Sequence, residues 1–82
     1  MAQLLYFGRL QDTTGCASAE FQFPSSVSTT NDLRDFLDKK FSSNGALLDA
    51  SVRIAINGEL VVDPAPVSNS DEIAFMPPVG GG

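Results

Sequence analysis

The residues best suited to chemistry stand at the end of the sequence, where residues 76–82 read MPPVGGG. Proline cannot donate to a β-ladder and favours extended backbone, so we expect a last strand to stop near Met76 and the chain to leave the domain stiffly. Fully extended, residues 77–82 would reach about 20 Å. Because glycine lacks Cβ, Gly80, Gly81 and Gly82 would let the backbone pass through a channel too narrow for side chains. The carboxylate of Gly82 is then the reactive group of a thin arm, the alternative being a chain end without function.

Few other side chains are suited to catalysis. The sequence has no His and a single Cys, Cys16, within the small polar segment TTGCAS. One thiol cannot form an internal disulfide or a multi-thiolate metal site, so zinc and iron–sulfur sites are excluded and we predict no metal site. Because no His is present to activate it, we interpret Cys16 as an incidental thiol rather than a nucleophile.

Composition and charge exclude further classes of function. The chain has 82 residues, enough for one domain with a modest core. Its net charge is −5 with only five Lys and Arg, so we expect no nucleic-acid partner. An acidic protein instead suits basic clefts on protein partners. No apolar run approaches the roughly 20 residues of a membrane span, and the N-terminus lacks a signal-like core, so we expect no membrane association and a cytoplasmic location.

Short apolar and alternating patterns predict the strands that would carry the arm. In the first of them, QLLYF, Leu4 and Tyr6 share one face while Leu5 and Phe7 share the other. Both faces are apolar, so this strand is either covered twice or meets a partner on its second face. The Asn-Gly pair at 57–58 is a strong hairpin signal, because both residues tolerate positive φ. The strands are predicted at residues 3–7, 20–24, 52–56, 59–62 and 72–76.

One amphipathic helix, over residues 30–42, is the clearest local signal. Thr29 can cap it together with Asp32, a weaker Asp version of the capping box. Two segments read as loops, GRLQDTTGCAS at 8–18 within a hairpin and SSNGALLDAS at 42–51 after the helix. The apolar stripe of the helix consists of Leu33, Phe36, Leu37 and Phe41.

These elements predict the fold class. One helix and about five strands must bury their apolar faces against each other, which favours an α+β fold with a curled mixed sheet over one main helix. A hairpin, a helix across the sheet and further strands, in this order, describe a ubiquitin-like β-grasp. We therefore predict a β-grasp domain at 1–76 and a flexible, extended tail, PPVGGG, at 77–82.

Three stretches of the chain resemble a known family. DEIAFMPPVGGG at 71–82, LLYFGRLQDTTG at 4–15 and INGELV at 56–61 resemble the small subunits of molybdopterin synthase, the sulfur carriers of molybdenum cofactor synthesis. The resemblance covers nearly the whole chain. Its specific part is the order of an acidic pair, an apolar strand, Pro-Pro-Val and a terminal Gly-Gly.

The resemblance implies a β-grasp protein that binds no cofactor of its own. An ATP-dependent adenylating enzyme would activate Gly82, and a sulfur donor would convert the acyl-adenylate to a thiocarboxylate, because the adenylate carries a good leaving group. The tail would then enter the active site of a large subunit, where two small-subunit turnovers per product deliver the dithiolene sulfurs to a cyclic pterin precursor. That partner would bind the pterin and supply the catalytic side chains, in a heterotetramer of two small and two large subunits.

The resemblance also implies roles for particular residues. Gly81 and Gly82 match the end of the family's motif, with the sulfur on Gly82, whereas Gly80 departs from the usual Ser, Thr or Ala. Apolar residues at three positions match those that the family uses to dock its partners, with core packing as the alternative. The predicted partner interface comprises Phe7, Leu60, Met76, Pro77, Pro78 and Val79.

Other functions remain open at this point. A sulfur carrier for thiamine thiazole or tRNA thiolation, or a ubiquitin-like protein modifier, would use the same tail and the same activation step. A different class is a non-catalytic binding module that docks a partner through Phe7, Leu60 and Met76 and has an inert tail. Such a module would tolerate truncation of the tail, whereas a carrier would not.

Overall fold

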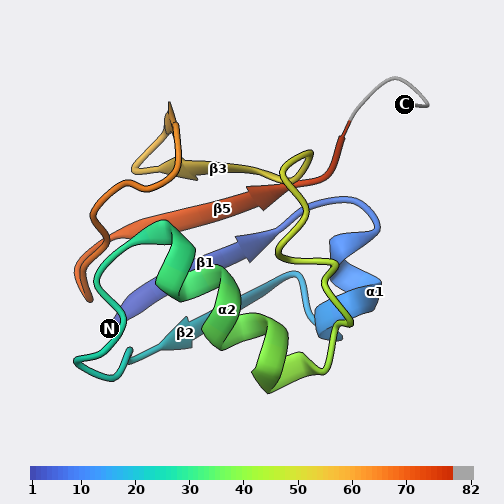
Figure 1. Cartoon of the computed structure of the whole chain (residues 1–82), viewed down its shortest axis with the longest axis horizontal. Coiled ribbons are helices and arrows are strands. Elements are labelled where there is room, and N and C mark those ends of the chain that lie inside the picture. The colour runs from blue at the N-terminus through green and yellow to red at the C-terminus, as the bar shows by residue number, and fades with distance from the viewer. Residues whose placement is uncertain (79–82) are drawn as a thin grey trace.

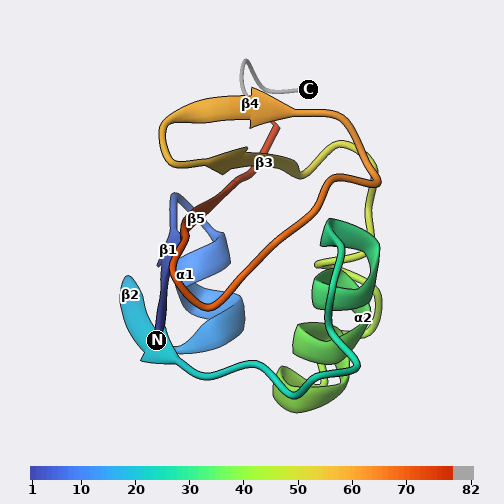
Figure 2. The same ribbon diagram turned by 90° about the vertical axis from the view of Figure 1, so that its left-hand side faces the viewer.

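The computed structural model describes residues 1–78, which form a five-stranded sheet with two helices on one side of it (Figures 1 and 2). The elements are β1 Ala2–Tyr6, α1 Leu10–Thr14, β2 Ser18–Phe21, α2 Thr30–Phe41, β3 Arg53–Ile56, β4 Glu59–Val61 and β5 Glu72–Met76. The strand order is β2-β1-β5-β3-β4. The central strands β1 and β5 are parallel, and the other pairings are antiparallel. A mixed sheet over one main helix confirms the predicted α+β, β-grasp fold.

The main helix begins and ends where its capping residues predict. The side chain of Thr29 accepts a hydrogen bond from the Asp32 backbone N–H, while Asp32 Oδ2 accepts one from the Thr29 backbone N–H. This reciprocal pair satisfies two donors that would otherwise be free at the helix N-terminus. At the other end Ser42 adopts a left-handed conformation, with φ of 51°, and terminates the helix. The predicted range of 30–42 is therefore correct to one residue.

The region between β1 and β2 differs from the prediction. The segment 8–18 is not a plain hairpin loop, because it contains the short helix α1, which ends at Gly15 in a left-handed conformation. A helix of five residues is too short to show a periodic pattern, and two of its residues, Leu10 and Thr14, are buried. The second strand is also shifted, since β2 ends at Phe21. Phe23 lies beyond that strand and is buried, with its backbone N–H donating to Asn69 Oδ1 at 2.7 Å.

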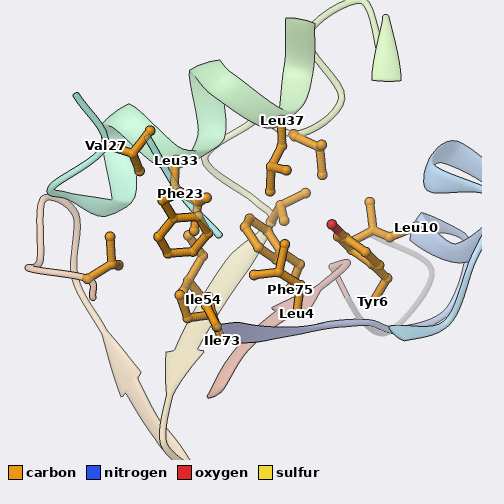
Figure 3. Packing of buried hydrophobic residues seen from close by; sticks show 14 residues of the cluster. Leu4, Tyr6, Leu10, Phe23, Val27, Leu33, Leu37, Ile54, Ile73 and Phe75 are labelled. Carbon is orange, nitrogen blue, oxygen red and sulfur yellow. The ribbon is translucent and has the colours of Figure 1, made fainter. Parts of the chain in front are cut away.

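The core lies between α2 and the side of the sheet that faces α2, which we call the inner face (Figure 3). Alternate residues of each strand point toward the helix, as the two-residue period of a strand requires. Burying each large aliphatic or aromatic side chain contributes about 1.5–3 kcal/mol to stability. The largest of these fully buried apolar side chains are Leu4, Tyr6, Leu33, Leu37, Leu47, Ile54, Ile73 and Phe75.

The buried guanidinium of Arg34 binds backbone carbonyls of the long segment after α2. The apolar pattern of the helix does not predict this interaction. Arg34 is 5% exposed, and its guanidinium donates to the carbonyl oxygens of Leu47, Asp49 and Val52 at 2.6–3.2 Å. Its Nε lies 2.9 Å from Asp63 Oδ2, an ion pair that is too poorly aligned to be a hydrogen bond. One side chain thus ties α2 to the turns before β3 and to the residues after β4.

The β3–β4 connection is the tight hairpin that the Asn-Gly pair predicts. Asn57 and Gly58 have φ values of 52° and 87°, between strands that end at Ile56 and begin at Glu59. The segment 42–51 consists of turns, as predicted. Neither α1 nor α2, the helices of the described residues 1–78, has the length and apolar character needed to cross a bilayer.

Candidate functional site

The two faces of the sheet differ in what covers them. Both helices lie on the same side, so among residues 1–78 no helix or strand covers the opposite side (Figures 1 and 2). Directly paired residues run across this uncovered side in one apolar row: Leu5 opposes Ala74, Ala74 opposes Ala55, and Ala55 opposes Leu60. We call it the outer face, with apolar residues Leu5, Phe7, Ala55, Leu60, Ala74 and Met76.

A second row of the outer face lies where β1 and β5 end. The backbone N–H of Phe7 donates to the Phe75 carbonyl at 3.1 Å, which extends the parallel pairing one residue beyond β1. Phe7 follows Leu5 in the outward series and is 46% exposed. Met76 opposes Arg53 across the β5–β3 pair and is partly buried. Apolar side chains therefore reach the edge at which the chain leaves β5.

The opposite end of the outer face is polar. Gln3 is paired with Glu20 on one side and with Glu72 on the other, and all three are exposed. An apolar centre with a polar boundary is the usual anatomy of a surface that binds another protein. The arrangement can bury apolar area against a partner.

The chain leaves the sheet at the apolar edge of the outer face. β5 ends at Met76, and Pro77 and Pro78 follow it outside any strand, both partly buried. Beside them lies a groove of about 440 Å³, lined by Ala50, Ser51, Arg53, Leu60, Met76, Pro77 and Pro78. Val79, Gly80, Gly81 and Gly82, the rest of the predicted tail, lie outside the described residues.

The predicted interface residues within the described range thus share one surface. Phe7, Leu60 and Met76 come from three parts of the sequence, and Pro77 and Pro78 continue from Met76. Leu60 is the most exposed of them, at 62%. Their use as a partner interface stays a prediction, since burial and pairing describe where they lie and not what they bind.

The site predicted from the sequence omits the middle of the outer face. Ala55, Ala74 and Arg53 belong to it, and only the pairing register brings them beside Leu60 and Met76. The alternation in RIAINGELV and EIAFM contains part of this signal. Small alanines on alternate positions show which face is not the core, but not which strands are neighbours.

Tyr6 and Asp49, two titratable side chains outside the outer face, have pKa values that their structural surroundings shift. Burial, and to a lesser extent the nearby Cys16, raises the pKa of Tyr6. Hydrogen bonds from the Ser51 backbone N–H and hydroxyl lower the pKa of Asp49, with smaller contributions from Arg9 and Arg34. Cys16 is half-buried, with Sγ 3.9 Å from the Thr14 carbonyl oxygen. Residues 1–78 contain no group of three or more Cys, Asp or Glu side chains placed to hold a metal ion.

Known sulfur carriers resemble this chain over its whole length. One relative, from Arabidopsis thaliana, is 36% identical over 98% of this chain and 81% of its own. Two more, from Escherichia coli (strain K12) and Haemophilus influenzae, are 32% and 31% identical over the whole of both chains. All three are named molybdopterin synthase sulfur carrier subunit, which confirms the family resemblance seen in the sequence.

Solved structures agree with the fold. A putative molybdopterin converting factor, subunit 1, from Pyrococcus furiosus has a TM-score of 0.77 at 25% identity, over 95% of this chain and 97% of that one. SAMP1 from Haloferax volcanii has a TM-score of 0.78 over 99% of this chain and 98% of that one. At 20% identity SAMP1 shows a shared fold alone. Residues 4–82 match the ThiS family, and with relatives at 31–36% identity this match shows that the chain belongs to the ThiS family.

Proposed function

We propose that this chain is the sulfur carrier of a molybdopterin synthase. In this proposal the carboxylate of Gly82 is converted to a thiocarboxylate and donates its sulfur inside the active site of a large subunit. The names of three relatives support the carrier role, and the ThiS family match extends through Gly82. A carrier needs a surface that binds its partner and an end that reaches into it.

One structural observation carries the proposal. The apolar outer face is contiguous with the residues at which the chain leaves β5, because Phe7 and Met76 occupy the row next to Pro77 and Pro78. A partner that covers the outer face is then in contact with the start of the tail. Fully extended, residues 77–82 could reach about 20 Å from the end of β5, far enough to enter a cleft in the bound partner.

Sulfur must be loaded before it can be donated, and a carboxylate is a poor electrophile. We propose that a Gly82 carboxylate oxygen attacks the α-phosphate of ATP on an activating enzyme, releasing pyrophosphate and forming an acyl-adenylate. A sulfur donor at the oxidation level of sulfide then attacks the carbonyl carbon, and AMP leaves as the C–S bond forms. ATP is the activating enzyme's substrate, so this chain supplies only the carboxylate.

The delivery step places the catalytic side chains on the partner. A large subunit binds the cyclic pterin precursor, and the thiocarboxylate sulfur adds to an electrophilic carbon of that precursor to give a thioester. Water then hydrolyses the thioester, which breaks the acyl C–S bond, leaves the sulfur on the pterin and restores the Gly82 carboxylate. Each carrier brings one sulfur, so a dithiolene requires two loaded carriers per product. A heterotetramer of two small and two large subunits is the assembly that we propose for this reaction.

Intact mass spectrometry tests the loading step. The chain is co-expressed with a candidate activating enzyme, and we expect a mass gain equal to the exchange of one oxygen for one sulfur, located at Gly82. Expression of the chain without the activating enzyme is the control and should leave the mass unchanged. An unchanged mass with every activating enzyme tested would contradict the carrier role. Covalent attachment to lysines of other proteins would instead identify a ubiquitin-like modifier.

Deletion of Gly82 tests where the chemistry lies. The truncated chain should fold and bind the large subunit with unchanged affinity, but it should form no pterin product. Its unchanged affinity serves as the internal control for docking. Product formation by the truncated chain in a purified system would exclude the proposed mechanism. Conversion of the pterin by the full-length carrier would also separate this function from thiazole and tRNA carriers.

A further inference from the structure

The turn after β1 touches the first residue of the tail. A Cβ placed on Gly8 would lie 2.9 Å from Pro77 Cγ and 3.7 Å from Pro77 Cδ. The first of these separations is shorter than real Cβ contacts. Gly8 also has a φ of +56°, which glycine adopts more readily than residues with a side chain. The pyrrolidine ring of Pro77 therefore occupies space that Gly8 leaves free.

The start of the tail lies close to the turn that follows β1. The Phe7 N–H to Phe75 carbonyl bond joins the two strands immediately before Gly8 and Pro77, so both segments leave the sheet side by side. A proline ring locks its own φ near −65° and biases the residue before it toward extended backbone. Holding the ring of Pro77 in place consequently orients Pro78 as well.

We propose that Gly8 is a positioning residue for sulfur transfer. By leaving room for Pro77, Gly8 sets the direction in which Pro77 and Pro78 leave the outer face toward the partner. Gly8 acts through Pro77 and does not touch the reacting group. The inference rests on the proposed function, since a direction matters only if the tail delivers sulfur to a bound partner.

The other described glycines supply a matched control. Gly15, Gly45 and Gly58 also have positive φ, between 79° and 88°, but nothing lies within 4 Å of a Cβ placed on them. Gly15→Ala therefore introduces backbone strain of a similar kind without a steric clash. A difference in sulfur-transfer rate between Gly8→Ala and Gly15→Ala is then caused by the clash with Pro77, because both variants carry the cost of a positive φ.

The experiment compares docking with transfer in five carriers: wild type, Gly8→Ala, Gly15→Ala, Pro77→Ala and the double variant Gly8→Ala/Pro77→Ala. Each is loaded with sulfur, and loading is verified by intact mass. We measure the dissociation constant for the large subunit and the single-turnover transfer rate at saturating large subunit. For Gly8→Ala we expect a dissociation constant close to that of Gly15→Ala and a transfer rate roughly 10- to 100-fold lower, because misplacement of about 1 Å has effects of this size.

Removing the proline ring should remove the effect of the alanine. Pro77→Ala eliminates the Cγ and Cδ atoms that the new Cβ would meet, so the double variant should transfer sulfur no more slowly than Pro77→Ala alone. A purely destabilising effect of Gly8→Ala would instead persist in the double variant. Equal transfer rates for Gly8→Ala and Gly15→Ala, or additive effects in the double variant, would overturn the proposal.

Two further comparisons keep the outcomes separate. If Gly8→Ala does not fold, Pro77→Ala is compared with Pro78→Ala, which also loses a proline but not one that lies against Gly8. We expect slower transfer from Pro77→Ala, and equal rates would overturn the proposal. Failure of the wild-type carrier to load or transfer sulfur would instead reject the proposed function.

Discussion

The inner and outer faces of the sheet are built from the same strands and are both apolar, yet they have different surroundings. On β5, Ile73 and Phe75 are fully buried beneath α2, whereas Ala74 and Met76 point to the uncovered side. The difference arises from the single-sided placement of the helices (Figure 2). An apolar residue on the inner face therefore contributes to the stability of the domain, whereas one on the outer face is accessible to a partner.

The largest effect should come from matched truncations on the two faces. Ile73→Ala on the inner face removes the same number of carbon atoms as Leu60→Ala on the outer face. Because Ile73 is fully buried, its truncation should lower the free energy of unfolding by about 2–5 kcal/mol. Leu60 is 62% exposed, and its truncation should change the free energy by no more than about 0.5 kcal/mol. Urea denaturation measures both, and equal losses would refute the distinction between the faces.

A charge on the outer face should affect binding without affecting the fold. Phe7→Glu places a carboxylate in the proposed interface, where it would lose water when the partner binds. We expect at least a tenfold weaker complex with the large subunit, or about 1.4 kcal/mol, at unchanged thermal stability. Asn31→Glu, an exposed change on α2, is the control and should bind normally. Normal binding by a stable Phe7→Glu variant would reject the interface assignment.

A smaller effect is expected from the Tyr6 hydroxyl, a buried polar group at the end of β1. The Tyr6 hydroxyl is buried and has no hydrogen-bond partner among the described residues, while its ring packs against Phe41 and Phe75. Tyr6→Phe keeps the ring contacts and removes the unpaired hydroxyl, so it should raise the free energy of unfolding by about 1 kcal/mol. A loss of stability in chemical denaturation would show that the hydroxyl has a partner.

The same substitution should change the alkaline pH dependence. Burial raises the pKa of Tyr6 in the folded protein above the usual value of 10, so the unfolded chain ionises first. The stability contributed by the neutral phenol is complete below pH 10 and is lost as the pH rises above it. The chain has one Tyr, so Tyr6→Phe should flatten this alkaline decline. An identical decline in the variant would assign it to another group.

The smallest effect should lie outside both faces, at the start of α2. Hydrogen bonds from the backbone N–H and hydroxyl of Ser28, and from Thr29, lower the pKa of Asp32. The stability contributed by its carboxylate is present above the usual pKa of 3.8 and is lost as the pH falls through the lower folded value. Asp32→Asn should therefore reduce the acid dependence of unfolding. An acid dependence of unfolding that is unchanged in Asp32→Asn would contradict this assignment.

The sequence predicted the main helix and the hairpin well because their signals are local. Thr29 and Asp32 are three residues apart, and Asn57 and Gly58 are adjacent, so the chain near each position determines its backbone. The short helix α1 was missed because five residues contain too little pattern. Arg34 was missed because its four contacts reach residues 13 to 29 positions further along the chain.

The sequence by itself determined which residues are apolar, where the capping and turn residues lie, and that PPVGGG follows the last strand. It also contained enough of a motif to identify the family. The tertiary structure alone decided that Phe7, Leu60 and Met76 share one uncovered surface and that Gly8 lies against Pro77. The reason is physical: strand pairing and helix placement bring distant residues together, and the period of a single strand cannot show which of its two faces a helix will cover.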